Sequence, residues 1–377
     1  MNTGRDRTIA QPGDPVDAID TPALVVDLDA MDRNLAAMAA FSLERGVRLR
    51  PHAKTHKSAW IARRQIEGGA VGVCVQKTSE AEALAALGVA DLYISNEVVD
   101  AAKLARVAAL AARVRLAIAV DSVEGVDRLA AAMRASRAPI DVFVEIDVGH
   151  GRCGAAPRDA AALARRIRDA GLRFAGLQAY QGRAQHLRGV QERRAAIEVA
   201  AEAVRAARAA LDAVRIDCAL VTGAGSGSFV LEAASGLWGE LQCGSYVFMD
   251  RDYADNEAMP DAPRFEHALF VKSQVMSRHA DRAVIDAGHK SHAIDSGLPR
   301  IWRRDDLVFA NGGDEHGIVR AQEGQARLPT LGEALWLVPG HCDPTVNLHD
   351  TMVGVRGGLD RGVVERLIAV DARGALG

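Results

Sequence analysis

The sequence predicts an α/β protein: a (β/α)8 TIM-like barrel followed by a second, mostly β domain. Three observations lead to this prediction. Short β-branched apolar runs alternate with long stretches of Ala, Leu and Arg over residues 21–245. Eight such runs occur before the pattern breaks near residue 245. Beyond residue 265 helical periodicity nearly disappears, and short apolar runs are separated by Gly, Pro and Asp, as in β domains.

Most of the eight runs are apolar on both faces, as strands of a buried parallel sheet are. They span Ala23–Leu28, Val47–Lys54, Gly72–Gln76, Asp91–Asn96, Arg115–Asp121, Ile140–Asp147, Phe174–Gly182 and Ile216–Thr222. Helical patterns separate them at Met31–Arg45, Ser58–Glu67, Ser79–Leu87, Val98–Ala112, Val123–Met133, Pro157–Ala170 and Val190–Val214. This alternation indicates parallel βαβ units, and eight strands favour a closed barrel over the alternative, an open doubly wound sheet.

The length of the chain also calls for a second domain. The 377 residues exceed a bare barrel of about 250 residues by about 130. We therefore expect the barrel over residues 21–245 and the β domain over 246–377 together with 1–20. Residues 1–20 would form either a flexible arm or an additional strand in the sheet of the β domain. The expected strands of that domain are Phe265–Ser277, Arg282–Asp286, Asp306–Phe309, Ile318–Val319, Ala334–Val338, Thr351–Arg356 and Gly362–Val370.

Composition excludes several classes of partner. Forty-six Lys and Arg against 49 Asp and Glu give a formal charge of −3, which argues against nucleic acid and leaves a small molecule as the expected substrate. No apolar run reaches the ~18 residues of a membrane span. Residues 1–20 are charged and lack an apolar core, so we expect no secretory signal. Five cysteines, an odd and sparse number, suggest reduced thiols and a cytoplasmic location.

Polar motifs stand at the ends of the expected strands, where the active site of an α/β barrel lies. The first is the segment Arg50–Lys57, which reads RPHAKTHK. A lysine inside a barrel mouth loses water, which lowers its pKa and makes it a nucleophile able to form a Schiff base with an aldehyde cofactor. We interpret Lys54 in this way. The alternative for Lys54 is a solvated basic turn, which is what we expect for Lys57.

Two further motifs follow later strands. Arg152 lies in the Gly-rich end of Glu145–Gly154, where its planar charged side chain could bind a phenolate or a carboxylate. The alternative is a tight turn with an ion pair. Tyr180 is the middle residue of the segment Gln178–Gly182, and His186 lies four residues beyond that Gly. A tyrosine and a histidine at this place can pack on a ring or move a proton, or each can be a satisfied structural group.

A Gly-rich loop, Thr222–Ser228, reads TGAGSGS and follows the last expected barrel strand. Glycines free the backbone amides, and a helix start adds its dipole, so the loop can hold a phosphate. It is not a P-loop, because no Gly-Lys-Ser/Thr follows, and it comes too late for a dinucleotide fingerprint. Barrels commonly place phosphate sites after their late strands.

The β domain carries a possible metal-binding pair, His341 and Asp343. In an extended segment residues i and i+2 point the same way, so both side chains can face one ion while Cys342 turns away. Imidazole with carboxylate suits Mn²⁺ or Mg²⁺ better than a closed thiolate zinc site. A polar turn before a strand is the alternative interpretation.

Taken together, these motifs resemble the D-threonine aldolase branch of the fold-type III pyridoxal phosphate enzymes, which have a barrel of the alanine racemase type. The resemblance runs through nearly the whole chain. Its carriers are Arg50–Lys57, Cys74–Lys77, Ile94–Val98, Glu145–Gly154, Leu177–Gly182, Glu240–Tyr246, Asp314–Gly317 and His341–Asp350.

The resemblance implies a role for each candidate residue. Lys54 would be the lysine that carries pyridoxal 5'-phosphate, Arg152 the donor to the cofactor's phenolic oxygen, and Tyr180 a residue lining its pocket. The phosphate would lie on the loop residues Thr222, Gly223, Gly225, Ser226 and Gly227. His341 and Asp343 resemble the family's ligands to a divalent metal, for which we expect Mn²⁺ or Mg²⁺ before Zn²⁺. His186 resembles the base near the substrate hydroxyl, and a homodimer is expected.

The activity implied is that of a lyase cleaving D-β-hydroxy-α-amino acids, such as D-threonine, to glycine and an aldehyde. One alternative is the 3-hydroxy-D-aspartate aldolase group, which gives glycine and glyoxylate and is similar in the same motifs. Another is dehydration of D-serine or 3-hydroxyaspartate. D-serine dehydratases use a His-X-Cys pair for zinc, so Asp343 favours an aldolase, although the adjacent Cys342 leaves a shift of register open. A non-catalytic pyridoxal phosphate carrier would resemble the barrel alone, and the His341 segment argues against it.

Overall fold

The computed structural model describes residues 9–322 and 327–377, which fall into two compact units. The barrel unit comprises residues 38–244, 256–263 and 374–377. The sheet unit comprises the described residues of 1–37, 245–255 and 264–373. Of the expected arm over residues 1–20, the first eight lie outside the described residues.

Eight parallel strands form the barrel wall in the described part of the chain, in the order β2-β9-β8-β7-β6-β5-β4-β3. They are β2 (Arg48–Leu49), β3 (Val73–Val75), β4 (Asp91–Ile94), β5 (Arg115–Val120), β6 (Asp141–Glu145), β7 (Arg173–Ala179), β8 (Val221–Gly223) and β9 (Glu240–Leu241). The wall closes between β2 and β3: the amide of Cys74 donates to the carbonyl of Pro51 at 2.8 Å, and His52 forms a parallel bridge with Cys74. The barrel prediction is confirmed, and the open doubly wound sheet is excluded.

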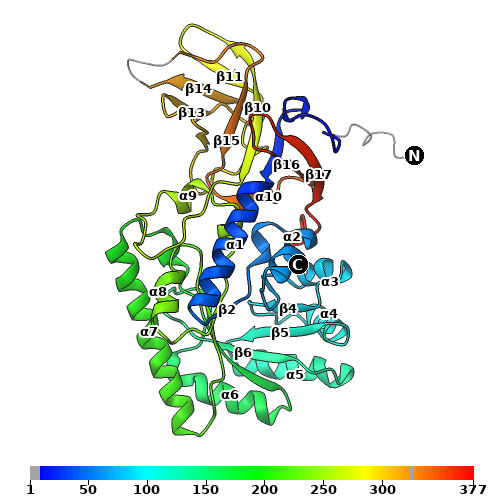
Figure 1. The fold of residues 1–377 in the computed structure, drawn as a ribbon. Coiled ribbons are helices and arrows are strands. Elements are labelled where there is room, and N and C mark those ends of the chain that lie inside the picture. Colours follow the sequence, from blue (N-terminus) through cyan, green and yellow to red (C-terminus); the bar gives the residue numbers. More distant parts are fainter. Residues whose placement is uncertain (1–8, 323–326) are drawn as a thin grey trace, which may run out of the picture. The chain divides into compact units, whose positions relative to one another are not determined.

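Helices alternate with the strands of the wall, as Figure 1 shows for α3 to α6 beside β4 to β6. The helices are α1 (Leu28–Glu44), α2 (Ala59–Glu67), α3 (Thr78–Ala86), α4 (Ala101–Ala111), α5 (Val123–Ser136), α6 (Ala160–Asp169), α7 (Val190–Ala213) and α8 (Phe229–Ala234). Local signals start some of them: the side chains of Asp100 and Ser122 accept backbone amides at the N-termini of α4 and α5. None of the helices within the described ranges has the length and hydropathy needed to span a bilayer.

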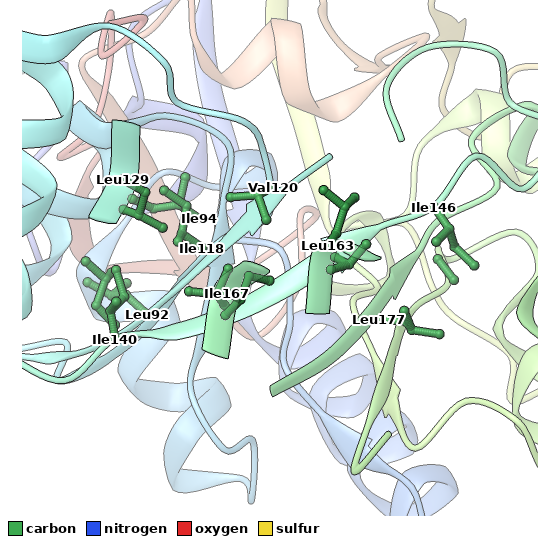
Figure 2. Close-up of a cluster of buried hydrophobic side chains, with 14 of the residues drawn as sticks. Leu92, Ile94, Ile118, Val120, Leu129, Ile140, Ile146, Leu163, Ile167 and Leu177 are labelled. Atoms are coloured by element: carbon green, nitrogen blue, oxygen red, sulfur yellow. The ribbon is translucent and has the colours of Figure 1, made fainter. Parts of the chain in front are cut away.

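The main core lies between the strands and these helices. Leu92 and Ile94 of β4 and Ile118 of β5 belong to one apolar cluster with helix residues such as Leu129 and Ile167 (Figure 2). Intervening strand residues fill the barrel interior instead, in a separate cluster: Cys74, Tyr93, Ala117, Ala119 and Phe143. This alternation explains why the strands read as continuous apolar runs, because both of their faces are buried.

The sheet unit is built on mostly antiparallel pairings, with the path β13-β14-β11-β10-β1-β16-β17 and with β15 paired to β10 and β12. Its strands are β1 (Ala23–Asp27), β10 (Leu269–Arg278), β11 (Ala283–Ile285), β12 (Arg300–Ile301), β13 (Leu307–Asn311), β14 (Gly317–Ala321), β15 (Ala334–Val338), β16 (Thr351–Arg356) and β17 (Val363–Ala369), with the short helices α9 (Arg251–Ala254) and α10 (Cys342–Val346). The buried ammonium of Lys272 donates to the carbonyls of Val16, Asp17 and Ile19, so this part of the N-terminal segment is fixed on the sheet.

One strand assignment from the sequence was wrong, and one barrel strand was missed. The run at Ala23–Leu28 is not a barrel strand: β1 pairs antiparallel with β10 and parallel with β16 in the sheet unit. A run that is apolar on both faces fits the interior of either sheet, so the pattern alone does not decide between them. The eighth barrel strand is instead β9, Glu240–Leu241, which pairs with β2 and β8. Two residues, one of them charged, give no detectable strand pattern.

The expectation that Lys57 is a solvated turn residue was also wrong. Its side chain is buried, with the residue only 6% exposed, and its ammonium donates to the buried carboxylate of Glu80 at 2.7 Å. The other carboxylate oxygen of Glu80 accepts the amides of Gln76 and Lys77 at the start of α3. Lys57 thus joins the segment after β2 to the start of a barrel helix.

Breaking this pair should cost stability. Replacing Lys57 by Met leaves the Glu80 carboxylate buried without its counter-charge, and we expect a loss of about 3–5 kcal/mol in the free energy of unfolding. The matched control is Arg128→Met, which removes the exposed Arg128–Glu124 pair and should cost less than about 1 kcal/mol. Urea denaturation of both variants measures the difference. Equal losses of stability in the two variants would show that the buried Lys57–Glu80 pair stabilises the fold no more than the exposed pair does.

Candidate cofactor and metal sites

Four of the candidate groups follow barrel strands at their carboxyl ends. Lys54 follows β2, Arg152 follows β6, Tyr180 follows β7, and the loop 222–227 overlaps the end of β8 and continues beyond it. Because all strands of the wall run parallel, these ends share one rim of the barrel. The structure therefore brings the residues expected at a cofactor to the same side of the barrel.

Lys54 lies in a 3₁₀ turn, Ala53–Thr55, that two histidines shape. The ring Nδ1 of His52 accepts the amide of Lys54 at 3.4 Å, and its Nε2 lies 2.8 Å from the side-chain amide of Gln76. His56 is fully buried, and its Nδ1 accepts the amide of Ser58 at 3.1 Å. Both histidines hold the backbone around a half-buried Lys54.

A buried charge network fixes β2 in the wall. The guanidinium of Arg50 contacts Glu240 of β9 at 3.2 Å and Asp91 of β4 at 2.5 Å. The hydroxyl of Thr222 donates to the same Glu240 carboxylate at 2.9 Å. Glu240 thereby connects the segment that carries Lys54 to the start of the Gly-rich loop.

A second polar network lies inside the barrel beneath this rim. The Tyr93 hydroxyl donates to the side-chain carbonyl of Gln178 at 2.9 Å, and burial raises the Tyr93 pKa, which keeps the hydroxyl protonated. The side-chain amide of Gln242 donates to Gln178 and to the Thr222 hydroxyl, both at 2.8 Å. These contacts satisfy buried polar groups and fix the ends of β7 and β8.

The Gly-rich loop has the backbone that a phosphate site needs. Ala224 has φ of +71°, a left-handed conformation of the kind found in backbone nests that bind anions. The fully buried Gln185 accepts the amide of Gly227 at 2.9 Å and donates to the Ser228 hydroxyl at 2.7 Å. A Cβ on Gly225 would lie 2.4 Å from the Gln185 side-chain oxygen. A larger residue there would displace the Gln185 side chain. Because the Gly227 amide already donates to Gln185, a phosphate would bind the other groups of the loop or displace this contact.

Arg152 lies between a carboxylate and an aromatic ring. Its Nη2 is 3.9 Å from Oε1 of Glu145, and its guanidinium carbon is 5.8 Å from the centre of the Tyr180 ring. The segment after β6 folds back, with a bridge between Ile146 and Ala155. The half-exposed guanidinium keeps its remaining N–H groups available to a ligand at the rim.

His186 is exposed at the end of the 3₁₀ turn Arg183–His186 that follows β7. Its neighbour Gln185 ties this turn to the Gly-rich loop through the contacts with Gly227 and Ser228. An exposed imidazole on a firmly held turn can accept a proton from a bound molecule.

His341 and Asp343 face a common point in the sheet unit, with Nε2 and Oδ1 3.8 Å apart. The expectation of a fully extended segment was only half right. His341 is extended, with φ −141° and ψ 138°, but α10 begins at Cys342, so Asp343 lies in its first turn. Cys342 is fully buried, and burial raises the pKa of its thiol.

Asp250 orients His341 and was missed by the sequence analysis. One oxygen of this fully buried carboxylate accepts from Nδ1 of His341 at 2.7 Å and from the amide of Cys342 at 2.9 Å. With the proton on Nδ1, the Nε2 lone pair is directed outward, the arrangement found behind metal-bound histidines. The donor set therefore fits a divalent metal with few protein ligands. The described residues contain no cluster of three or more His, Cys, Asp or Glu side chains arranged for a metal.

Comparison with known proteins identifies relatives along the whole chain. The profile of the alanine racemase N-terminal domain matches residues 26–252, and that of a putative serine dehydratase domain matches residues 268–355. D-threonine aldolase of Arthrobacter sp. is 48% identical over 97% of this chain and 96% of its own length. 3-hydroxy-D-aspartate aldolase of Paracoccus denitrificans (strain Pd 1222) is 42% identical over 97% of this chain and 95% of its own. The crystal structure of D-threonine aldolase from Filomicrobium marinum superimposes with a TM-score of 0.95 at 48% identity, covering 98% of this chain and all of that one.

The buried carboxyl group of Glu232 contacts the end of the Gly-rich loop. Glu232 of α8 is 1% exposed and accepts the Ser228 hydroxyl at 2.8 Å, and burial raises its pKa to about 7. The folded protein therefore holds a proton that the unfolded chain, with the ordinary value of 4.5, releases first. The stabilisation from this group is complete below about pH 4.5 and is lost as the pH rises through 7.

Glu232→Gln, which cannot ionise but still accepts from Ser228, should remove this pH dependence. We expect the variant to match the wild type near pH 4.5 and to exceed its stability above pH 7 by on the order of 3 kcal/mol. Unfolding midpoints across that pH range, with the exposed Glu198→Gln as control, test it. Parallel pH curves for Glu232→Gln and the wild type would contradict the assignment.

Proposed function

This chain belongs to the fold-type III pyridoxal phosphate family, in the branch of D-threonine aldolase, and on that premise we propose that it cleaves D-β-hydroxy-α-amino acids to glycine and an aldehyde. The observation that carries the proposal is the His341–Asp343 pair. An imidazole and a carboxylate 3.8 Å apart, backed by Asp250, favour a hard divalent cation in a protein whose barrel rim carries Lys54. The second ligand is the carboxylate of Asp343 and not a cysteine thiolate, which favours aldol cleavage over dehydration.

The residues that would hold pyridoxal 5'-phosphate are Lys54, Arg152 and Tyr180, with the loop residues Thr222, Gly223, Gly225, Ser226 and Gly227 at its phosphate. When bound, the cofactor supplies a ring system that takes up the electron pair left on Cα. Lys54 would contribute its primary amine at Nζ, the atom that would bond the cofactor. Arg152 would donate to the cofactor's phenolic oxygen and, as a permanent cation, would favour the ionised form of that oxygen.

The base for the reaction would be His186. It accepts the proton of the substrate β-hydroxyl at an imidazole nitrogen, directly or through water, so that the Cα–Cβ bond can break. Its turn is fixed by the buried Gln185, which keeps the imidazole at a constant place relative to the Gly-rich loop.

The residues that would hold the metal are His341, through Nε2, and Asp343. When bound, Mn²⁺ or Mg²⁺, preferred here over Zn²⁺, supplies Lewis-acid stabilisation of the substrate β-oxygen. Asp250 keeps the His341 proton on Nδ1, which leaves Nε2 as the ligand atom.

A second candidate substrate is 3-hydroxy-D-aspartate, with glyoxylate as the aldehyde product. The segment Asp295–Pro299 resembles that aldolase group and also other members of the branch, so it does not separate the two substrates. Relatives 42% identical bear the name 3-hydroxy-D-aspartate aldolase. Dehydration of D-serine or 3-hydroxyaspartate comes third. We also expect a cytoplasmic homodimer. The five cysteines, all of them within the described residues, are free thiols, which supports a reducing compartment.

Product analysis decides among these reactions. With Mn²⁺ present, purified protein should release glycine from D-threonine, D-threo-phenylserine and 3-hydroxy-D-aspartate, and Lys54→Ala should release none. Glycine from 3-hydroxy-D-aspartate alone would move the assignment to the second candidate. Ammonia with pyruvate or oxaloacetate would identify a dehydratase and overturn the proposal.

The metal assignment has its own test. Asp250 accepts the amide of Tyr253 at Oδ1 and both Nδ1 of His341 and the amide of Cys342 at Oδ2. Asp250→Asn must place its NH2 group against at least one of these donors, which disturbs the position of the His341 ring, and Mn²⁺ affinity should fall by about 10–100-fold. Electron paramagnetic titration of Mn²⁺ measures this without turnover. Asp360→Asn, on an exposed ion pair of the same unit, is the control and should bind normally. Undiminished Mn²⁺ binding by Asp250→Asn would mean that His341 does not depend on Asp250.

A further inference from the structure

Two acidic residues in the recognised motifs have no role in the reaction described above. Glu97 follows β4, and Glu145 ends β6. Their side chains lie within hydrogen-bonding reach of each other. Glu145 is only 5% exposed. In the described structure, Oε2 of Glu145 has no hydrogen-bond donor, and the donors near Glu97 are its own backbone amide and the Cys153 thiol.

The surroundings of the pair disfavour two negative charges. Burial, followed by the charge of Glu97, raises the pKa of Glu145. Burial and the charge of Asp121, which follows β5, raise the pKa of Glu97 in the same way. The neighbouring Cys153 thiol stays neutral, because burial and Glu97 raise its pKa to about 11. Two adjacent carboxyl groups in such a place ordinarily keep one proton between them.

The cation beside the pair is Arg152, with Nη2 at 3.9 Å from Glu145. A pair holding one proton carries a single negative charge, which matches the charge of the guanidinium beside Glu145. Asp121 is the other acidic group that acts on Glu97, and its carboxylate accepts the amide of Gly154. A doubly ionised pair would draw Arg152 fully onto the carboxylates, and a neutral pair would leave no charge on Glu145 for the guanidinium. The one-proton state therefore keeps the guanidinium between Glu145 and Tyr180.

We propose that Glu97 and Glu145 share one proton and, as a single negative charge, are positioning residues for Arg152. The inference rests on the proposed function only in that Arg152 contacts the cofactor. Neither carboxyl group needs to touch the substrate.

The test measures the dissociation constant of pyridoxal 5'-phosphate from the apo protein, by absorbance titration at neutral pH without substrate. Glu97→Gln and Glu145→Gln each leave one carboxylate ionised, which reproduces the charge of the native pair, so each should bind within about twofold of wild type. The double variant has no charge and should bind about tenfold more weakly, the cost of a lost charge-assisted contact. In an Arg152→Ala background the double substitution should add nothing. Glu124→Gln, on an exposed helix pair, is the control.

Several results would overturn the proposal. Single variants as weak as the double would mean that both carboxylates are ionised. A double variant with normal affinity would mean that the pair does not position Arg152, and a loss that persists without Arg152 would mean general damage to the fold. A further contrary result is a cofactor affinity that changes with the monovalent cation in the buffer for the wild type but not for the double variant. That result would show that a bound cation, and not a proton, lies between the two carboxylates.

An infrared measurement keeps the proposal testable if the double variant does not fold. At neutral pH the wild type should show one more protonated carboxyl group than either single variant, and equal signals would contradict the shared proton. Because neither experiment uses a substrate, a wrong substrate assignment would leave both results unchanged, whereas failure of the proposed function would appear in product analysis alone.

Discussion

The buried ion pair between Arg50 and Glu240 is the interaction on which the cofactor side of the protein depends. Strand β2 has only two residues, so it contributes few backbone hydrogen bonds to the wall. The guanidinium of Arg50 compensates by contacting carboxylates on β9 and β4 together. Lys54 follows directly from this anchored strand, and Glu240 also receives the hydroxyl of Thr222 at the start of the Gly-rich loop. One carboxylate thereby sets the positions of both segments that would hold the two ends of the cofactor.

The same arrangement recurs at each candidate group: a buried polar side chain from another part of the chain fixes the residue that would meet a ligand. His52 holds the backbone of Lys54, Gln185 holds the Gly-rich loop, and Asp250 holds the ring of His341. Burial makes these contacts directional, because an unsatisfied polar group in the interior is costly. It also makes them sensitive to charge, as the raised pKa values of Glu145 and Glu232 show. These supporting residues therefore fix the positions of the side chains and backbone that would meet the ligands.

The sequence was informative where a local pattern corresponds to one structure. Strands β3 to β8 and helices α1 to α7 follow from their apolar patterns. The places of Lys54, Arg152, Tyr180 and the Gly-rich loop follow from the rule that parallel strands end at one rim. It failed where the decision depends on distant residues. The apolar run of β1 fits two sheets, and only its pairing with β10 and β16 decides between them. The sequence around Lys57 is typical of a surface turn, and only the fold shows that its side chain is buried against Glu80. Asp250 lies 91 residues before His341, so nothing in the local sequence marks its role.

We infer that Lys54, held at the rim by the anchored β2, is the residue that bonds pyridoxal 5'-phosphate. Reduction of the holoenzyme with borohydride, followed by digestion and peptide mass mapping, locates the bonded residue. We expect a single pyridoxyl group on Nζ of Lys54. A pyridoxyl group on Lys57 or Lys77, or no covalent label in protein that has retained its cofactor, would contradict it.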